Sequence, residues 1–219
     1  MKYIIMCGGD YPSWESPRQL LEINGEPIVA RTIRLLRENG IDDIAISSND
    51  DRFGRFSVPL LKHDNYYYAV VYNFSDGFWC NCFYPTNEPT TYLFGDVVYS
   101  PRAIRTIIET ETNDVAFFGS APPFAPEYLK PYIEPFGFKV VNTEHLKKAC
   151  ADVKRIYEEH RFNREPIAWE TWNVISRGYA GDPNWIDYNS YIHINDYTCD
   201  IDNPHELKLV ELLARRVEG

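Results

Sequence analysis

Short apolar runs and one amphipathic segment alternate along the first fifty residues. Residues 2–7 are mostly apolar and run into Gly8, which predicts a buried strand that enters a glycine-rich loop. An Asn-Gly turn signal at residues 24 and 25 follows, and Pro27 then opens a helical stripe that Gly40 is placed to end. The run at 43–48 predicts a second strand. Strand, helix and strand in this order are typical of a parallel sheet.

The second half of the chain adds further strands and helices. The segment TYLFGDVVYS, residues 91–100, predicts a strand, a Gly-Asp turn and a second apolar run. Ser100 and Pro101 then predict the start of a helix that continues to about Thr110. We expect residues 120–190, which include a proline-rich stretch, to form an insertion that covers the substrate. The remaining expected elements are an apolar run at 114–120, a strand at 138–142, a helix at 144–159, a strand-like segment at 191–202 and a C-terminal helix that begins at Asn203-Pro204-x-Glu206.

Composition and charge narrow the class of protein. The chain has 219 residues, of which 44% are hydrophobic, so we expect one ordered domain, 1–219, with a single core. A formal charge of −10 disfavours binding to nucleic acid or to an anionic membrane. With neither a leader segment nor a long apolar run, the expectation is a soluble, cytoplasmic protein. The five cysteines are odd in number and scattered, which indicates buried thiols and neither a disulfide framework nor a zinc site.

Three polar features fall where predicted strands end. Gly8 and Gly9 allow backbone NH groups to approach a phosphate closely, and Arg18 follows them in a loop. Asp96 and Asp202 each end a predicted strand. Nucleotidyl transfer needs such a set, because the triphosphate requires backbone donors and a cation while Mg²⁺ requires carboxylates. Each feature alone is also common as a turn or a helix cap, so the interpretation depends on their order.

The order of these features resembles the GT-A-type nucleotidyltransferases, the MobA-like and sugar-phosphate nucleotidyltransferase group. The segment CGGDYPSWESPRQLLEINGEPIVARTIRLLRENGIDDIAISSND follows that family's glycine-rich loop, Pro-basic pair, hairpin and helix. LFGDVVYS is similar to its Gly-Asp strand, and DIDNPHEL to its DIDTPEDL segment. The resemblance covers nearly the whole chain outside 120–190. It implies an α/β fold of the Rossmann-like GT-A type, a three-layer αβα sandwich with a mixed, mostly parallel sheet.

The resemblance also implies a reaction and the residues that carry it. Asp96 and Asp202 would hold Mg²⁺ or Mn²⁺, with Asp200 as the alternative to Asp202, and Arg18 would contact the phosphates. An acceptor phosphate would attack the α-phosphorus of a nucleoside triphosphate, and pyrophosphate would leave. The acceptor is expected to be a sugar, polyol or choline phosphate. The residues expected at the nucleotide are Cys7, Gly8, Gly9, Asp10, Arg18, Gly77 and Asp96, and those expected at the acceptor are Lys139, Glu170 and Trp172.

Two departures from the family pattern keep rival hypotheses open. The loop DYPSWES lacks the family's arginine for the leaving pyrophosphate, and the Pro-Lys pair has become Pro17-Arg18, so Arg18 is expected to serve both roles. A non-catalytic nucleotide or sugar-phosphate binding module is therefore one alternative. A GT-A glycosyltransferase is another, although it calls for Asp-x-Asp where the chain has Gly95-Asp96-Val97. Lys139 has the alternative of an exposed strand position and Trp172 that of a core position. The nucleobase, the acceptor and the oligomeric state, a homodimer included, stay open.

Overall fold

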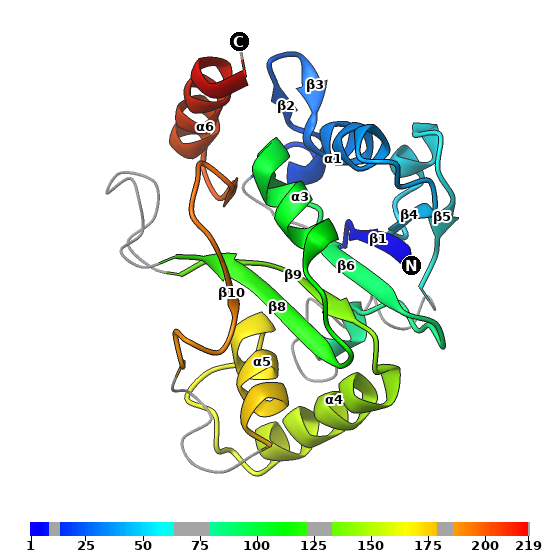
Figure 1. Cartoon of the computed structure of the whole chain (residues 1–219), viewed down its shortest axis with the longest axis vertical. Helices are drawn as coiled ribbons and strands as arrows, with labels where there is room; N and C mark the ends of the chain where they lie inside the picture. Colours follow the sequence, from blue (N-terminus) through cyan, green and yellow to red (C-terminus); the bar gives the residue numbers. More distant parts are fainter. Residues whose placement is uncertain (9–13, 64–78, 122–132, 179–185, 219) are drawn as a thin grey trace.

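A mixed sheet of seven strands forms the centre of the structure (Figure 1). The computed structural model describes residues 1–8, 14–63, 79–121, 133–178 and 186–218. The strand order is β10-β8-β9-β6-β1-β4-β5, in which β9 is antiparallel to both neighbours and the other four pairings are parallel. The mixed, mostly parallel sheet expected from the sequence is thus confirmed. The strands are β1 (Lys2–Met6), β4 (Ile44–Ser47), β5 (Leu60–Leu61), β6 (Thr90–Phe94), β8 (Val115–Ser120), β9 (Pro135–Val140) and β10 (Ile192–Ile194).

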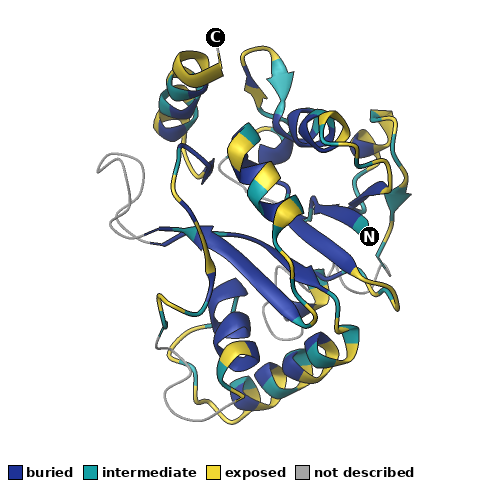
Figure 2. Cartoon of the chain, viewed as in Figure 1, coloured by how far each residue is buried: buried dark blue, intermediate teal, exposed yellow. Residues whose placement is uncertain are grey.

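Helices cover both faces of this sheet and complete a three-layer αβα sandwich. Because side chains alternate across a strand, Tyr3 and Ile5 of β1 face one layer while Ile4 and Met6 face the other. The five inner strands between the two layers are almost entirely buried, whereas the edge strands β5 and β10 are partly exposed (Figure 2). The three-layer arrangement expected from the sequence is confirmed. The first layer contains α1 (Ile28–Glu38) and α3 (Pro101–Glu109), and the second contains α4 (Thr143–Glu158) and α5 (Ala168–Arg177).

A smaller hydrophobic cluster joins the last helix to an early hairpin. Asn24 and Gly25 both have positive φ angles, 54° and 81°, which is the turn that the Asn-Gly signal predicts. Ile23 of this hairpin packs in one cluster with Val210 and Ala214 of the last helix. None of the helices in the described ranges is long and apolar enough to cross a membrane. The elements of this region are β2 (Glu22–Ile23), β3 (Glu26–Pro27), β7 (Val97–Val98), β11 (Cys199–Asp200) and α6 (Pro204–Glu218); the short 3₁₀ helices are Arg18–Leu20, Asp51–Arg55 and Trp79–Cys82.

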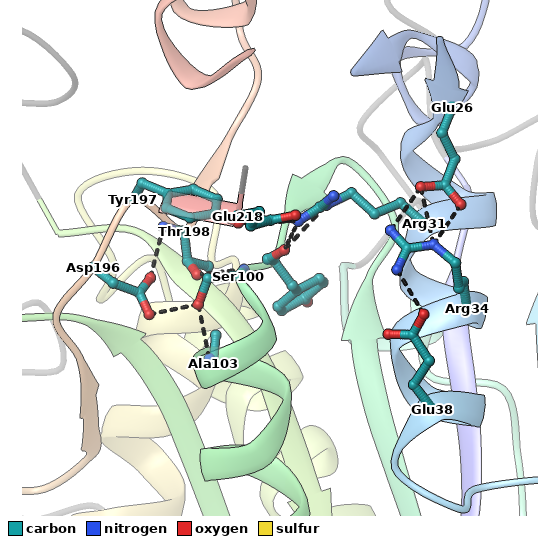
Figure 3. A network of polar contacts seen from close by, with 11 residues as sticks. Glu26, Arg31, Arg34, Glu38, Ser100, Ala103, Asp196, Tyr197, Thr198 and Glu218 are labelled. Carbon is teal, nitrogen blue, oxygen red and sulfur yellow. Dashed lines mark hydrogen bonds and ion pairs between the residues drawn. The ribbon is translucent and has the colours of Figure 1, made fainter. Parts of the chain in front are cut away.

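A buried polar network fastens the last part of the chain to the first layer of helices (Figure 3). Arg31 of α1 is 4% exposed, donates to the Tyr197 hydroxyl at 3.0 Å and forms an ion pair with Glu218. The Ser100 hydroxyl, which caps α3, donates to Asp196 at 2.5 Å. Breaking a buried pair leaves an uncompensated charge, so this network holds the segment that leads into α6 in place.

Within the stretch 120–190 that was expected to be an insertion, the described residues 133–178 contribute to the central sheet and to its second helical layer. β9 lies between β6 and β8 in the middle of the sheet, and α4 and α5 form the second helical layer. The strand expected from residue 138 begins earlier, at Pro135. A proline is compatible with this position, because the first residue of a strand tolerates a missing NH group. Residues 122–132 and 179–185 of this stretch lie outside the described ranges.

Candidate active site at the carboxyl edge of the sheet

Asp96 lies beside the end of the first strand. β1 and β6 are adjacent and parallel, so both end at the same edge of the sheet, and the Gly95 NH group donates to the Met6 carbonyl at 3.0 Å. A Cβ atom on Gly95 would lie 2.6 Å from Cys7 Sγ and 2.7 Å from Met6 O. Burial raises the pKa of the Cys7 thiol and the negative charge of Asp96 raises it further. The Gly-Asp turn therefore needs glycine to bring Asp96 against the residues that follow β1.

Asp202 is held near Asp96 by a two-stranded ladder and a helix cap. β11 pairs antiparallel with β7, and the Ile201 NH group donates to the Asp96 carbonyl at 3.3 Å. Glu206 of α6 is 6% exposed and its Oε2 accepts the NH groups of Asp202 at 2.7 Å and Asn203 at 3.2 Å. Asn203 Oδ1 accepts the Glu206 NH in return at 3.1 Å, which completes a reciprocal capping pair. The backbone on both sides of Asp202 is therefore fixed.

Arg18 connects the two carboxylates. Its Nη2 donates to Asp96 Oδ2 at 2.6 Å, and its Nη1 forms an ion pair with Asp202 and donates to the Ile201 carbonyl at 2.8 Å. The Arg18 side chain is 4% exposed, against 17% for Asp96 and 42% for Asp202. Arg18 is 78 positions from Asp96 and 184 from Asp202 in the chain. The structure thus brings together the three residues that the sequence singled out for phosphate and metal binding.

Further carboxylates lie close to Asp96 in the described part of the chain. Burial raises the pKa of Asp96, the Arg18 charge lowers it, and the charges of Asp200 and Asp202 raise it again. Among the described residues, the carboxylates of Asp200 and Asp202 therefore both act on Asp96, and Arg18 contacts Asp96 and Asp202. Glu134, buried just before β9, accepts the Asp200 NH at 3.1 Å and adds a further carboxylate, within 4.8 Å of ligand atoms of Cys199 and Asp200. The described part of this edge thus brings four carboxylates together, those of Asp96, Glu134, Asp200 and Asp202.

The donor atoms at this cluster suit a hard divalent cation. Asp96 and Asp202 offer carboxylate oxygens that both face the same positive group, and oxygen is the ligand that Mg²⁺ and Mn²⁺ prefer. Asp200, the alternative ligand, has its backbone engaged in β11 and acts on Asp96 through its charge. The residues present therefore fit the metal that the resemblance implies.

Gln19 is a buried residue of this region that the sequence did not mark. It is 1% exposed, and its Nε2 donates to the Gly8 carbonyl at 3.4 Å. A Cβ atom on Gly95 would lie 3.0 Å from its Cγ. Its buried Oε1 has no hydrogen-bond partner within the part of the chain that the structure describes. Gln19 thus packs between the entry to the glycine-rich loop and the Gly-Asp turn, a contact that no local pattern reveals.

Lys139 does not join the carboxylates. It pairs with Thr91 near the beginning of β6, whereas Asp96 follows the end of that strand, so the two lie toward opposite edges of the sheet. Its ammonium donates to three main-chain carbonyls at the end of α3, those of Ile107, Ile108 and Thr110, at 2.7–3.2 Å. It is 7% exposed, so it is not a solvent-facing strand lysine either. The expected contact with an acceptor phosphate is corrected to a structural role.

The other two residues expected at the acceptor also have structural partners. Glu170 Oε2 accepts the Ile167 NH at 3.0 Å at the start of α5, and its carboxylate pairs with Arg164 at 2.8 Å. Trp172 stacks on Phe117 at 5.5 Å between ring centroids, and its indole NH donates to the Ser190 hydroxyl at 2.9 Å. Trp172 therefore occupies the core position that was its alternative. Gly9, Asp10 and Gly77, expected at the nucleotide, lie outside the described residues.

Comparison with known proteins places the chain in a family. Residues 3–163 match the model of the MobA-like NTP transferase domain. The chain belongs to this family. It is therefore a nucleotidyltransferase, and the matched range includes Arg18 and Asp96. Among curated proteins, none matches the chain in sequence.

Solved structures of other nucleotidyltransferases share the fold of this MobA-like chain. The inositol-1-phosphate CTP transferase from T. maritima is 14% identical with a TM-score of 0.57, over 100% of this chain and 96% of that chain. The 2-C-methyl-D-erythritol 4-phosphate cytidylyltransferase from Thermus thermophilus is 13% identical with a TM-score of 0.59, over 98% of each chain. At this identity the likeness shows the fold alone, and it extends over the C-terminal segment that carries Asp202.

Proposed function

We propose that this nucleotidyltransferase joins a nucleoside monophosphate to a small phosphorylated acceptor, with Mg²⁺ or Mn²⁺ held by Asp96 and Asp202. The observation that carries the proposal is the convergence of these two carboxylates on one buried guanidinium at the carboxyl edge of β1 and β6. In an α/β sheet, ligands bind at this edge of the strands. Membership of the family supports the reaction class, and the convergence of Asp96 and Asp202 on Arg18 supports the choice of residues.

Residues at this edge of the sheet support binding and positioning of the substrates. The backbone at Gly8 follows β1 and can approach the phosphates, and the Arg18 guanidinium is permanently charged and can fork across two phosphate oxygens. An acceptor phosphate oxygen then attacks the α-phosphorus in line, and pyrophosphate leaves. When bound, the metal neutralises charge that develops on the phosphate oxygens. Because no proton has to be removed from an ionised phosphate, the reaction requires no general base and depends mainly on positioning.

A polyol phosphate is the acceptor class that we propose to test first. The two structurally similar enzymes act, by their names, on inositol 1-phosphate and on 2-C-methyl-D-erythritol 4-phosphate, and both use cytidine nucleotides. The glycosyltransferase alternative receives no support, because an Asp-x-Asp motif needs a second carboxylate two positions from Asp96, where the chain has Phe94 and Val98. Val97, the residue after Asp96, is fully buried in β7.

The experiment is a matrix of four ribonucleoside triphosphates against phosphorylated polyols, sugars and choline, with pyrophosphate release as the signal. We expect turnover for one triphosphate with one acceptor class, and loss of turnover after the metal is removed with EDTA and its recovery with Mg²⁺. The unphosphorylated form of each acceptor is the matched control and should give no pyrophosphate. Metal-dependent nucleotide binding without pyrophosphate release for any pair would contradict the proposal, and so would transfer of sugar from a nucleotide-sugar.

A further inference from the structure

Arg18 already neutralises the two carboxylates to which the metal is assigned. Its guanidinium contacts Asp96 and Asp202 at the same time and is 4% exposed. A divalent cation that uses both carboxylates must share them with this guanidinium or displace it. Sharing brings two positive groups together in a partly buried region, where like charges repel far more strongly than in water. Displacement strands a buried guanidinium, which is costly unless another anion receives it.

A triphosphate is the anion that can receive the displaced guanidinium. Its oxygens match the planar fork of an arginine, so Arg18 can exchange carboxylate oxygens for phosphate oxygens without loss of charge pairing. The exchange frees Asp96 and Asp202 for the metal, which the triphosphate also binds. Arg18 needs only a local movement, because the backbone at Gly8 and the Gly95-Asp96 turn already lie side by side, joined through Gln19.

We propose that Arg18 is the resident counter-ion of this site, so that the site accepts the divalent cation together with a triphosphate and disfavours the free ion. This inference rests on the proposed metal site at Asp96 and Asp202. It predicts reciprocal coupling, in which the triphosphate strengthens metal binding and the metal strengthens triphosphate binding by the same factor. If Arg18 instead only oriented the carboxylates for the metal, its removal would weaken the binding of the free metal ion.

The first experiment is a titration of free Mn²⁺ into folded protein, followed by calorimetry or by the spin signal of Mn²⁺. We expect Arg18→Gln to bind free Mn²⁺ at least about tenfold more tightly than the wild type, because one positive charge has left the site. Arg18→Lys keeps the charge and should stay within about threefold of the wild type. The control is Arg34→Gln, which removes a 41%-exposed arginine from an ion pair with Glu26 and should change nothing. Equal or weaker Mn²⁺ binding by folded Arg18→Gln would overturn the proposal.

The second experiment uses the wild type alone and does not depend on how the variants fold. Equilibrium dialysis measures retained Mn²⁺ and phosphorus with and without inorganic tripolyphosphate, a probe that carries the phosphates and no base. Tripolyphosphate lowers the concentration of free Mn²⁺, so stronger retention of Mn²⁺ in its presence requires a ternary complex. We expect retention of Mn²⁺ to rise at least about tenfold. Tight retention of free Mn²⁺ that tripolyphosphate does not increase would overturn the proposal.

The two proposals fail in distinguishable ways. If no acceptor supports pyrophosphate release while Arg18→Gln strengthens Mn²⁺ binding, the reaction is wrong and the counter-ion role stands. If pyrophosphate is released while Arg18→Gln weakens Mn²⁺ binding, the reaction stands and the counter-ion role is wrong. An Asp202→Asn variant locates the bound ion, because Mn²⁺ binding should fall when one of the two proposed ligands is neutralised.

Discussion

Two buried cations lie toward opposite edges of the central sheet, and their partners differ in kind. Arg18 is 4% exposed and contacts two carboxylates and one carbonyl. Lys139 is 7% exposed and contacts three main-chain carbonyls at the end of α3. Their burial is nearly equal, so burial alone does not distinguish a functional cation from a structural one. The difference lies in whether the partners are groups that another ligand can use.

The partners decide whether each cation can be exchanged. The carbonyls around Lys139 are the last acceptors of α3, where the helix dipole favours a positive charge, and their geometry is fixed by the helix. Burial lowers the pKa of Lys139, while the negative charge of Glu111 opposes that shift. The carboxylates around Arg18 are side chains that can bind a metal ion equally well. The contact of Lys139 is therefore part of the fold, whereas the contact of Arg18 is the one that we propose a ligand replaces.

Neutralising a carboxylate at the Arg18 edge should give the largest effect. Asp96→Asn preserves the shape of the side chain and removes its charge, so we expect pyrophosphate release to fall about a thousandfold, or about 4 kcal/mol in the transition state. The thermal midpoint should fall as well, because the buried Arg18 guanidinium loses the charge of one carboxylate partner, although the asparagine oxygen can still accept its hydrogen bond. Initial rates and thermal melts of the same preparation measure both quantities. Activity within tenfold of the wild type would remove Asp96 from the reaction.

Filling the space at Gly95 should damage the same edge through the backbone. A Cβ atom there would lie 2.6 Å from Cys7 Sγ and 2.7 Å from Met6 O, so Gly95→Ala must move either β1 or the turn that carries Asp96. We expect a loss of about 2–3 kcal/mol in the free energy of unfolding, measured by urea denaturation. Gly54→Ala is the matched control, since its Cβ would meet only Leu60 at an ordinary 3.8 Å. Equal stability of the two variants would contradict the close approach at Gly95.

Changing the cation at the opposite edge should affect stability without affecting the reaction. Lys139→Met keeps an unbranched side chain that is one atom shorter but leaves three carbonyls at the end of α3 without their donor. We expect unfolding to become easier by about 2 kcal/mol, since other donors can recover part of the loss. The kcat/KM value at a temperature where the variant is folded should stay within about twofold. A selective rise in the KM of the acceptor would restore Lys139 as an acceptor-binding residue.

Weakening the helix cap beside Asp202 should give the smallest effect. Glu206→Gln removes the charge that accepts two NH groups of the Asp202 segment, so we expect a loss of about 1 kcal/mol in stability. The position of Asp202 should become less well defined, with kcat/KM a few-fold lower. Glu158→Gln, at the exposed end of α4, is the control and should change neither quantity. A normal rate with a loosened cap would show that the position of Asp202 does not depend on Glu206.

Local patterns predicted the parts of the fold that local interactions determine. The first strand, the Asn-Gly hairpin and α1 follow from an apolar run, a two-residue turn and a helical stripe that lie next to one another in the chain. The place of β9 in the middle of the sheet did not follow, because antiparallel pairing with β6 and β8 is not written in its own sequence. The role of Lys139 was missed for the same reason, since its partners depend on where α3 ends.

The candidate site shows the same division. The order of the glycines, Arg18, Asp96 and Asp202 along the chain was visible, because each lies next to a recognisable strand or helix boundary. The capping pattern at Asn203 and Glu206 was visible too, although not its use in holding Asp202. Gln19 and Glu134 were not visible, since their contacts join segments that are distant in sequence.

The pairing of β7 with β11 has a consequence for the enzyme's activity during folding and unfolding. Asp96 and Asp202, the two carboxylates that we propose bind the metal, are brought together by the pairing of β11 with β7, and Arg18 is 184 positions from Asp202 in the chain. Contacts of such long separation require that the chain between them is already ordered, so they depend on the rest of the fold. The central sheet can therefore be folded while the enzyme is inactive. Activity should report the docking of the β11 and α6 segment, and far-ultraviolet circular dichroism the sheet and helices as a whole.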